Sequence, residues 1–153
     1  MSQTPILNVV TLAHLIMLSM WGGVVATEAV IEVYPFRKRD LAEATIRFHY
    51  WIDLLVELPL VLAVLATGIA SVCLSDHITR LHVVKIAFAG AAIAVNLFCI
   101  AVVLRRDRQR LAGATSERLR RASRVVLACF AVGLLFAAVA ATLGFSLALT
   151  RLG

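Results

Sequence analysis

The sequence is poor in charge, with only 16% of its 153 residues being Asp, Glu, Lys or Arg, whereas 61% are hydrophobic. It also has no stretch that resembles a nucleophile elbow, a phosphate-binding glycine loop or a Cys/His zinc cluster. A soluble domain of this length could not bury so much apolar surface, and the hydrophobic residues come in blocks rather than on one periodic face. We therefore predict an all-α integral membrane protein with a single transmembrane domain over residues 1–153.

Cysteines are few, and Cys73, Cys99 and Cys129 form no close-spaced motif such as Cys-x-x-Cys. Because all three lie in or at the ends of apolar stretches, we expect small buried hydrophobic side chains and no disulfide. No basic residue precedes the first apolar stretch, and that stretch is too long for a typical signal peptide. We therefore expect it to be retained.

Four apolar stretches reach the roughly 20 residues that a helix needs to cross a bilayer. They predict a four-helix bundle with spans at about residues 6–31, 50–74, 81–104 and 125–149. The link between the second and third spans is short, so these two helices should be antiparallel neighbours.

Basic residues are concentrated in two of the connections. One group lies between spans one and two, and eight arginines lie in an Arg-rich loop at 105–124, in which 113–116 offers a break. By the positive-inside rule both connections are cytoplasmic and both termini lie on the outer, periplasmic side, as in a bacterial inner membrane protein. The Arg105–Arg124 segment predicts contact with anionic lipid headgroups, or with an acidic partner, rather than with nucleic acid.

The first span carries polar side chains on one stripe. His14, Trp21 and Glu28 recur every seven residues, close to two helical turns, and Glu32 follows one turn later. An ionisable group inside a membrane span costs roughly 2.5–3.5 kcal/mol on insertion scales, so it should face protein, water or a cofactor. This stripe predicts one wall of a polar interior site.

The second span brings a matching face, because His49, Asp53 and Glu57 are spaced by four residues. With Glu28 they predict an inner polar layer whose oxygen and imidazole groups suit manganese, iron or zinc. A proton path is equally compatible.

An interfacial position is the alternative for some members of this layer. We expect Glu32 and His49 to lie among lipid headgroups, with Arg37 or Arg47 pairing the acids. Pro59 should free the Leu55 carbonyl and kink the helix near the site.

A second polar layer is expected toward the outside, where His14 meets His82 and Lys85 at the start of the third span. A neutral His in a membrane interior can ligate haem iron, or can simply form a hydrogen bond. Trp21 is too deep for an interfacial belt, so its ring should pack against neighbours or a cofactor. A seam of small and polar residues continues along the third span through Ala89, Ala92, Asn96 and Cys99.

Two of these segments resemble a known family. His14 followed by Trp21-Gly22-Gly23, and Leu81-His82-Val83-Val84-Lys85 opening the third span, resemble the haem-containing protoporphyrinogen oxidase family of small four-helix membrane proteins. The His14 to Trp21-Gly22-Gly23 pattern also resembles that of copper-resistance D-type membrane proteins. In the oxidase family the first-span His is associated with haem b and the third-span Lys is functional, so the resemblance implies haem binding at His14 and a catalytic role for Lys85.

Three functions follow from these patterns. The first is a haem b redox protein in which His14, His82 and Trp21 bind the cofactor, Lys85 is catalytic, and quinone or another redox partner takes the electrons. The second is divalent metal binding or permeation, with ligands drawn from His14, Glu28, His49, Asp53 and Glu57. The third is a non-catalytic subunit of a larger complex or a homo-oligomer.

Overall fold

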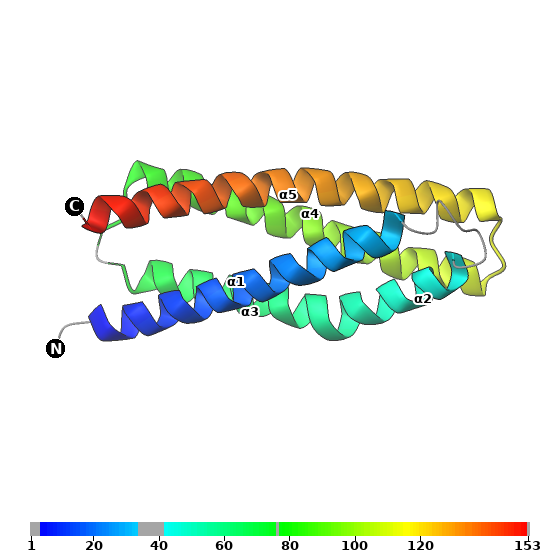
Figure 1. Ribbon diagram of the computed structural model, residues 1–153, viewed down its shortest axis with the longest axis horizontal. Helices are drawn as coiled ribbons and strands as arrows, with labels where there is room; N and C mark the ends of the chain where they lie inside the picture. The colour runs from blue at the N-terminus through cyan, green and yellow to red at the C-terminus, as the bar shows by residue number, and fades with distance from the viewer. Residues whose placement is uncertain (1–3, 34–41, 76, 153) are drawn as a thin grey trace.

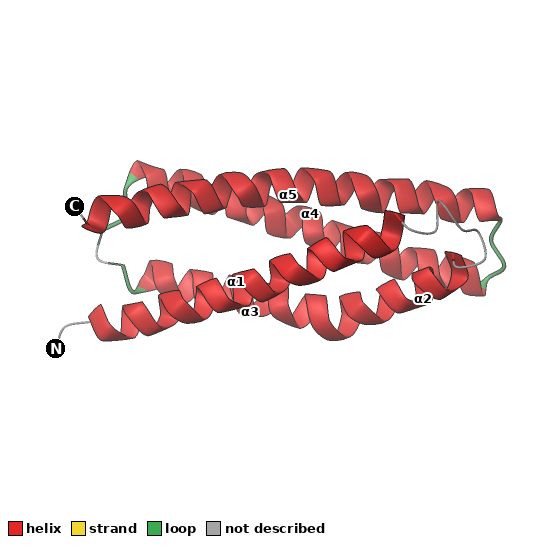
Figure 2. Cartoon of the chain, viewed as in Figure 1, coloured by secondary structure: helices red, strands yellow, loops and turns green. Residues whose placement is uncertain are grey.

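The computed structural model describes residues 4–33, 42–75 and 77–152, and over these ranges the chain forms helices with no strand (Figure 2). Asp53–Glu57 is a π-helical turn, so α2, η3 and α3 are consecutive parts of one long helix. The elements are α1 (Thr4–Val33), α2 (Ala42–Ile52), η3 (Asp53–Glu57), α3 (Leu58–Cys73), α4 (Arg80–Leu111) and α5 (Ser116–Leu152).

The helices run side by side as an antiparallel four-helix bundle, which confirms the predicted fold class. The start of α1 and the end of α5 lie at one end, and α4 joins α5 at the other (Figure 1). α4 and α5 pack along much of their length, while α1 lies on α3 and then crosses toward α5. The expected pairing of spans two and three is only partial, because α4 contacts the second span mainly through α2 and touches α3 at few positions.

The distribution of side chains is the reverse of that in a soluble protein. Each of the four long helices is apolar enough to cross a membrane, and large hydrophobic side chains such as Leu12, Leu55 and Leu134 are exposed on the outside. Many of the best-buried side chains are instead polar or charged. Lipid solvates the apolar exterior, and the polar groups find partners inside. The chain is therefore a multi-pass membrane protein.

The helices extend beyond the predicted apolar spans. The Arg-rich segment expected to be a loop at 105–124 is mostly helical, since α4 continues to Leu111 and α5 begins at Ser116. Arg, Gln and Leu are strong helix formers, and nothing requires a helix to stop at the membrane surface. The expected break is confirmed at Gly113, whose φ of 73° only glycine adopts readily.

The π turn explains how three polar residues stay on one face. In an α-helix, residues spaced by four drift by about 40° per step, so Glu57 would be rotated by about 80° from His49. The Leu58 N–H instead bonds the Asp53 carbonyl five residues back, which widens the turn and reduces this drift. Pro59, which has no N–H, follows directly, so the irregularity expected near it takes the form of a π turn.

Candidate metal centre

The inward stripe of α1 is confirmed by burial. Trp21, Glu28 and Glu32 are buried, with Glu28 showing no exposed surface, whereas His14, nearer the start of the helix, is half-buried. The flanking residues Met20 and Val30 are exposed. The seven-residue period, with Glu32 one turn beyond it, thus places one tryptophan and two carboxylates inside the bundle.

α2 and η3 deliver the opposing groups. His49, Asp53 and Glu57 are each no more than 2% exposed. The π turn directs the Asp53 and Glu57 carboxylates to the face of the helix that His49 occupies.

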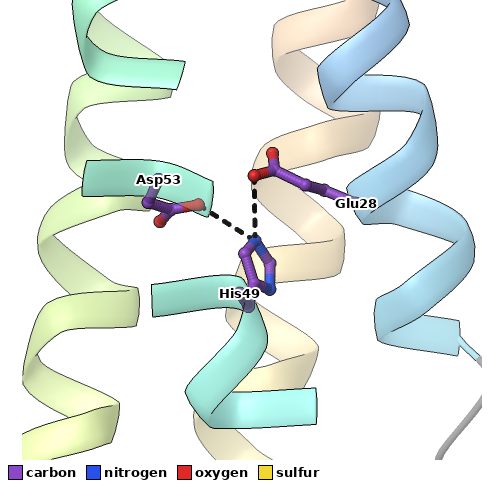
Figure 3. Close-up of side chains that lie close together, drawn as sticks. All are labelled: Glu28, His49 and Asp53. Carbon is purple, nitrogen blue, oxygen red and sulfur yellow. Dashed lines mark ion pairs between the residues drawn. The ribbon is translucent and has the colours of Figure 1, made fainter. Parts of the chain in front are cut away.

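Glu28, His49 and Asp53 converge on one point (Figure 3). The Nε2 atom of His49 lies 3.3 Å from Asp53 Oδ1 and 4.0 Å from Glu28 Oε1. One donor atom from each residue lies within 4.8 Å of the other two. Both oxygens of Glu28, both of Asp53 and the Nε2 of His49 are buried without a hydrogen-bond partner. Five buried oxygen and nitrogen atoms without a partner around one point are energetically costly, because buried polar groups are normally hydrogen-bonded or bound to a metal.

The other side of the His49 ring is firmly held. Its Nδ1 lies 2.8 Å from Glu32 Oε2 and 3.3 Å from an Arg106 nitrogen. A carboxylate can only accept and a guanidinium can only donate, so the shorter contact indicates that Nδ1 carries the proton and donates it to Glu32. The lone pair then lies on Nε2, facing Glu28 and Asp53. Phe130 stacks on the ring with centroids 5.9 Å apart.

Arg106 of α4 locks this arrangement. It is fully buried and donates to both oxygens of Glu32 and, over 2.8 Å, to the Ser123 hydroxyl. The paired donation fixes the Glu32 carboxylate in plane, and that carboxylate in turn fixes the His49 ring.

Glu57 lies beside the group but has its own partners. The Trp21 indole N–H donates to Glu57 Oε1 over 3.2 Å, and the Asn96 amide donates to the same oxygen over 2.5 Å. Glu57 is therefore a neighbour of the trio with partners of its own. The Trp21 ring packs against Val61 and Val64, as one of its two expectations had it, and its N–H also orients the Glu57 carboxylate.

The charges in this interior do not balance. Four buried carboxylates (Glu28, Glu32, Asp53 and Glu57) face one guanidinium, Arg106, so three negative charges remain when His49 is neutral. Asp107 is also buried but is paired with Arg110. Unpaired charge in a membrane interior is strongly unfavourable, so the group needs a further cation or protons.

The interfacial expectation for Glu32 and His49 is wrong. Both are buried inside the bundle, where Glu32 is paired with Arg106 and His49 with Glu32; Arg47 is exposed, and Arg37 lies outside the described residues. The helix ends extend past the apolar spans, so groups near the predicted membrane edge are still covered by α4 and α5. Arg106 was missed because it lies within a run of arginines whose pattern does not distinguish a buried member.

The outer layer is arranged differently. His14 Nδ1 lies 2.9 Å from the Thr67 hydroxyl, and its ring packs on Gly68. Lys85 lies against Gly144 of α5, and His82 contacts Thr79 at the start of α4. None of these contacts joins His14 to Trp21, which belongs to the inner group.

The structure also tests the expectations for the α4 seam and for the cysteines. The seam along α4 faces inward, since Ala92, Asn96 and Cys99 are buried. The three cysteines are free thiols, but only Cys99 is fully buried, and Cys73 is exposed, contrary to the expectation for it.

Comparison of the chain with protein-family models, with curated proteins and with solved structures gave no match. The functional argument therefore depends on the residues themselves.

Proposed function

We propose that this membrane protein binds one divalent transition-metal ion through Glu28, His49 and Asp53. The observation that carries the proposal is the group of five buried, unpartnered donor atoms on these residues. A divalent cation would satisfy them together and would remove most of the excess negative charge. Two carboxylates and one imidazole suit manganese, iron or zinc.

The surrounding contacts support a metal more than an accidental acid cluster. A metal-binding His commonly donates its other ring N–H to a carboxylate, and His49 does so to Glu32. Three protein ligands leave coordination positions for water or a substrate, as in catalytic rather than structural sites. We therefore propose a metal-dependent activity within the bilayer rather than a purely structural role for the ion.

Metal content tests the proposal. Protein in detergent, loaded with Mn²⁺ or Zn²⁺ and dialysed, should retain about one ion per chain, and Asp53→Asn or His49→Gln should lower the affinity at least about tenfold. Glu43→Gln is the matched control, because this carboxylate begins the same helix but is exposed and paired with Arg110. Equal metal content in Asp53→Asn and in the control would contradict the proposal and would favour protons as the neutralising cations.

Haem b remains a hypothesis from the resemblance to the protoporphyrinogen oxidase family. The described contacts favour the acidic group, because Trp21 is bonded to Glu57 and His14 to Thr67. An absorption spectrum of the purified protein without a Soret band would end the haem hypothesis and leave the metal proposal unaffected.

We also propose that both termini face the periplasm of a bacterial inner membrane. Its support is the basic residues of the Arg105–Arg124 segment at the opposite end of the bundle. Cys73 is exposed at the end of α3, at the same end as the start of α1. A membrane-impermeant maleimide should therefore label intact spheroplasts, and Cys73→Ser should abolish the signal. Labelling only after permeabilisation would show that this end of the bundle faces the cytoplasm, which contradicts the proposed orientation.

A further inference from the structure

A cavity of about 250 Å³ lies between α1, α4 and α5, next to the candidate metal centre but outside it. Ala92, Asn96 and Cys99 of α4 line it on one side, and residues of α1 and α5 form the rest of its lining. Several of these, including Gly22 and Leu134, are exposed on the bundle surface. In a membrane the cavity therefore opens sideways, toward lipid.

The shape of the cavity comes from small residues flanked by aromatic ones. A Cβ added at Gly22 would meet no atom within 4 Å, so the space beside it is open. Trp21 and Phe130 contribute flat apolar rings to the lining. An apolar cavity of about 150 Å³ can hold one benzene ring, so this larger cavity has room for a substituted ring.

One polar group of the lining lacks a partner. Asn96 is only 7% exposed, and its amide nitrogen donates to Glu57, but its Oδ1 atom is buried without a hydrogen-bond partner. Asn96 lines the cavity, so a ligand that brings a hydrogen-bond donor would satisfy this oxygen once the side chain turns it toward the cavity. A saturated acyl chain would fill the cavity but leave this oxygen unsatisfied.

We propose that the cavity binds the ring of a membrane-soluble phenol or quinol that enters from the bilayer. The ring lies against Trp21 and Phe130, its hydroxyl group donates to Asn96 Oδ1, and its apolar tail leaves through the open side. This site does not depend on a bound metal. It adjoins the metal centre, because Trp21 and Asn96 both hold Glu57 and Phe130 stacks on His49.

A matched pair of probes tests the hydroxyl contact. In metal-free detergent solution, 4-octylphenol and 4-octylanisole are compared, because a methyl group in the anisole replaces the hydroxyl proton and removes the hydrogen-bond donor. Trp51 is exposed on the outside, so a Trp51→Phe background leaves Trp21 as the reporter of the cavity. We expect saturable changes in Trp21 fluorescence, with the phenol binding about tenfold more tightly than the anisole.

Three variants separate the cavity from non-specific partitioning. Gly22→Leu should abolish the saturable change for both probes, and Ala138→Leu, at another exposed position of the lining, should do the same if Gly22→Leu fails to fold. Asn96→Leu should retain anisole binding but lose the preference for the phenol. Equal binding of the two probes to the parent protein, or unchanged binding in the filled variants, would overturn the proposal. Because no metal is present, either result leaves the proposed function untouched.

Discussion

Replacing Arg106 by Met should destabilise the bundle by roughly 3–5 kcal/mol, the usual cost of removing one partner of a buried ion pair. The change leaves Glu32 buried with its negative charge uncompensated, in an interior that already has excess negative charge. It also releases the Ser123 hydroxyl and loosens the carboxylate that holds the His49 ring. Methionine fills a similar volume, so a cavity contributes little to the expected loss.

The measurement is the unfolding transition in detergent, followed by circular dichroism. Arg105→Met is the control, since Arg105 is the adjacent residue of the same type but is exposed. Adding Glu32→Gln to Arg106→Met should recover much of the stability, because it removes the stranded charge. Similar stability of the Arg105 and Arg106 variants would show that the buried pair is not what holds α1 to α4.

Asp53→Asn should change stability in opposite directions with and without metal. In the metal-free protein the substitution removes one of three uncompensated buried charges, so the variant should unfold at a higher temperature than the parent. With Mn²⁺ at about 100 times its dissociation constant, the parent should gain roughly 2.7 kcal/mol and the variant much less. The parent is therefore less stable than Asp53→Asn without the ion and more stable with it. Such a reversal is expected where a site favours function over stability.

Thermal unfolding with excess chelator and with excess Mn²⁺ measures both halves of this prediction. Glu43→Gln, which changes an exposed carboxylate on the same helix, should follow the parent in both conditions. If Asp53→Asn is less stable than the parent even in chelator, the carboxylate contributes to the fold and the charge account is wrong.

The sequence predicted the fold because membrane spans are encoded by length and hydropathy. It also predicted the inner polar layer, since the seven-residue stripe of α1 and the four-residue spacing from His49 to Glu57 are periodic. Periodicity reveals which residues share a face of one helix. Burial then confirmed that these faces point inward.

Contacts between helices could not be predicted in the same way. Glu32 and His49 are covered because α4 extends to Leu111. The predicted apolar span ended two residues before Arg106, so this cover could not be foreseen. Pro59 predicted an irregularity near the site, but the π form of the turn depends on a backbone bond between Leu58 and Asp53 that the side chains do not reveal. The cavity is lined by residues of α1, α4 and α5 together, which no single-helix pattern describes.

The most direct test of the central claim is electron spin echo spectroscopy of the protein loaded with Mn²⁺. The account predicts modulation from one directly coordinated nitrogen, the Nε2 atom of His49, which disappears in His49→Gln but persists in His77→Gln, where an exposed loop histidine is changed. A spectrum of bound Mn²⁺ without any nitrogen coupling, or one that is identical in His49→Gln, would contradict coordination at Glu28, His49 and Asp53.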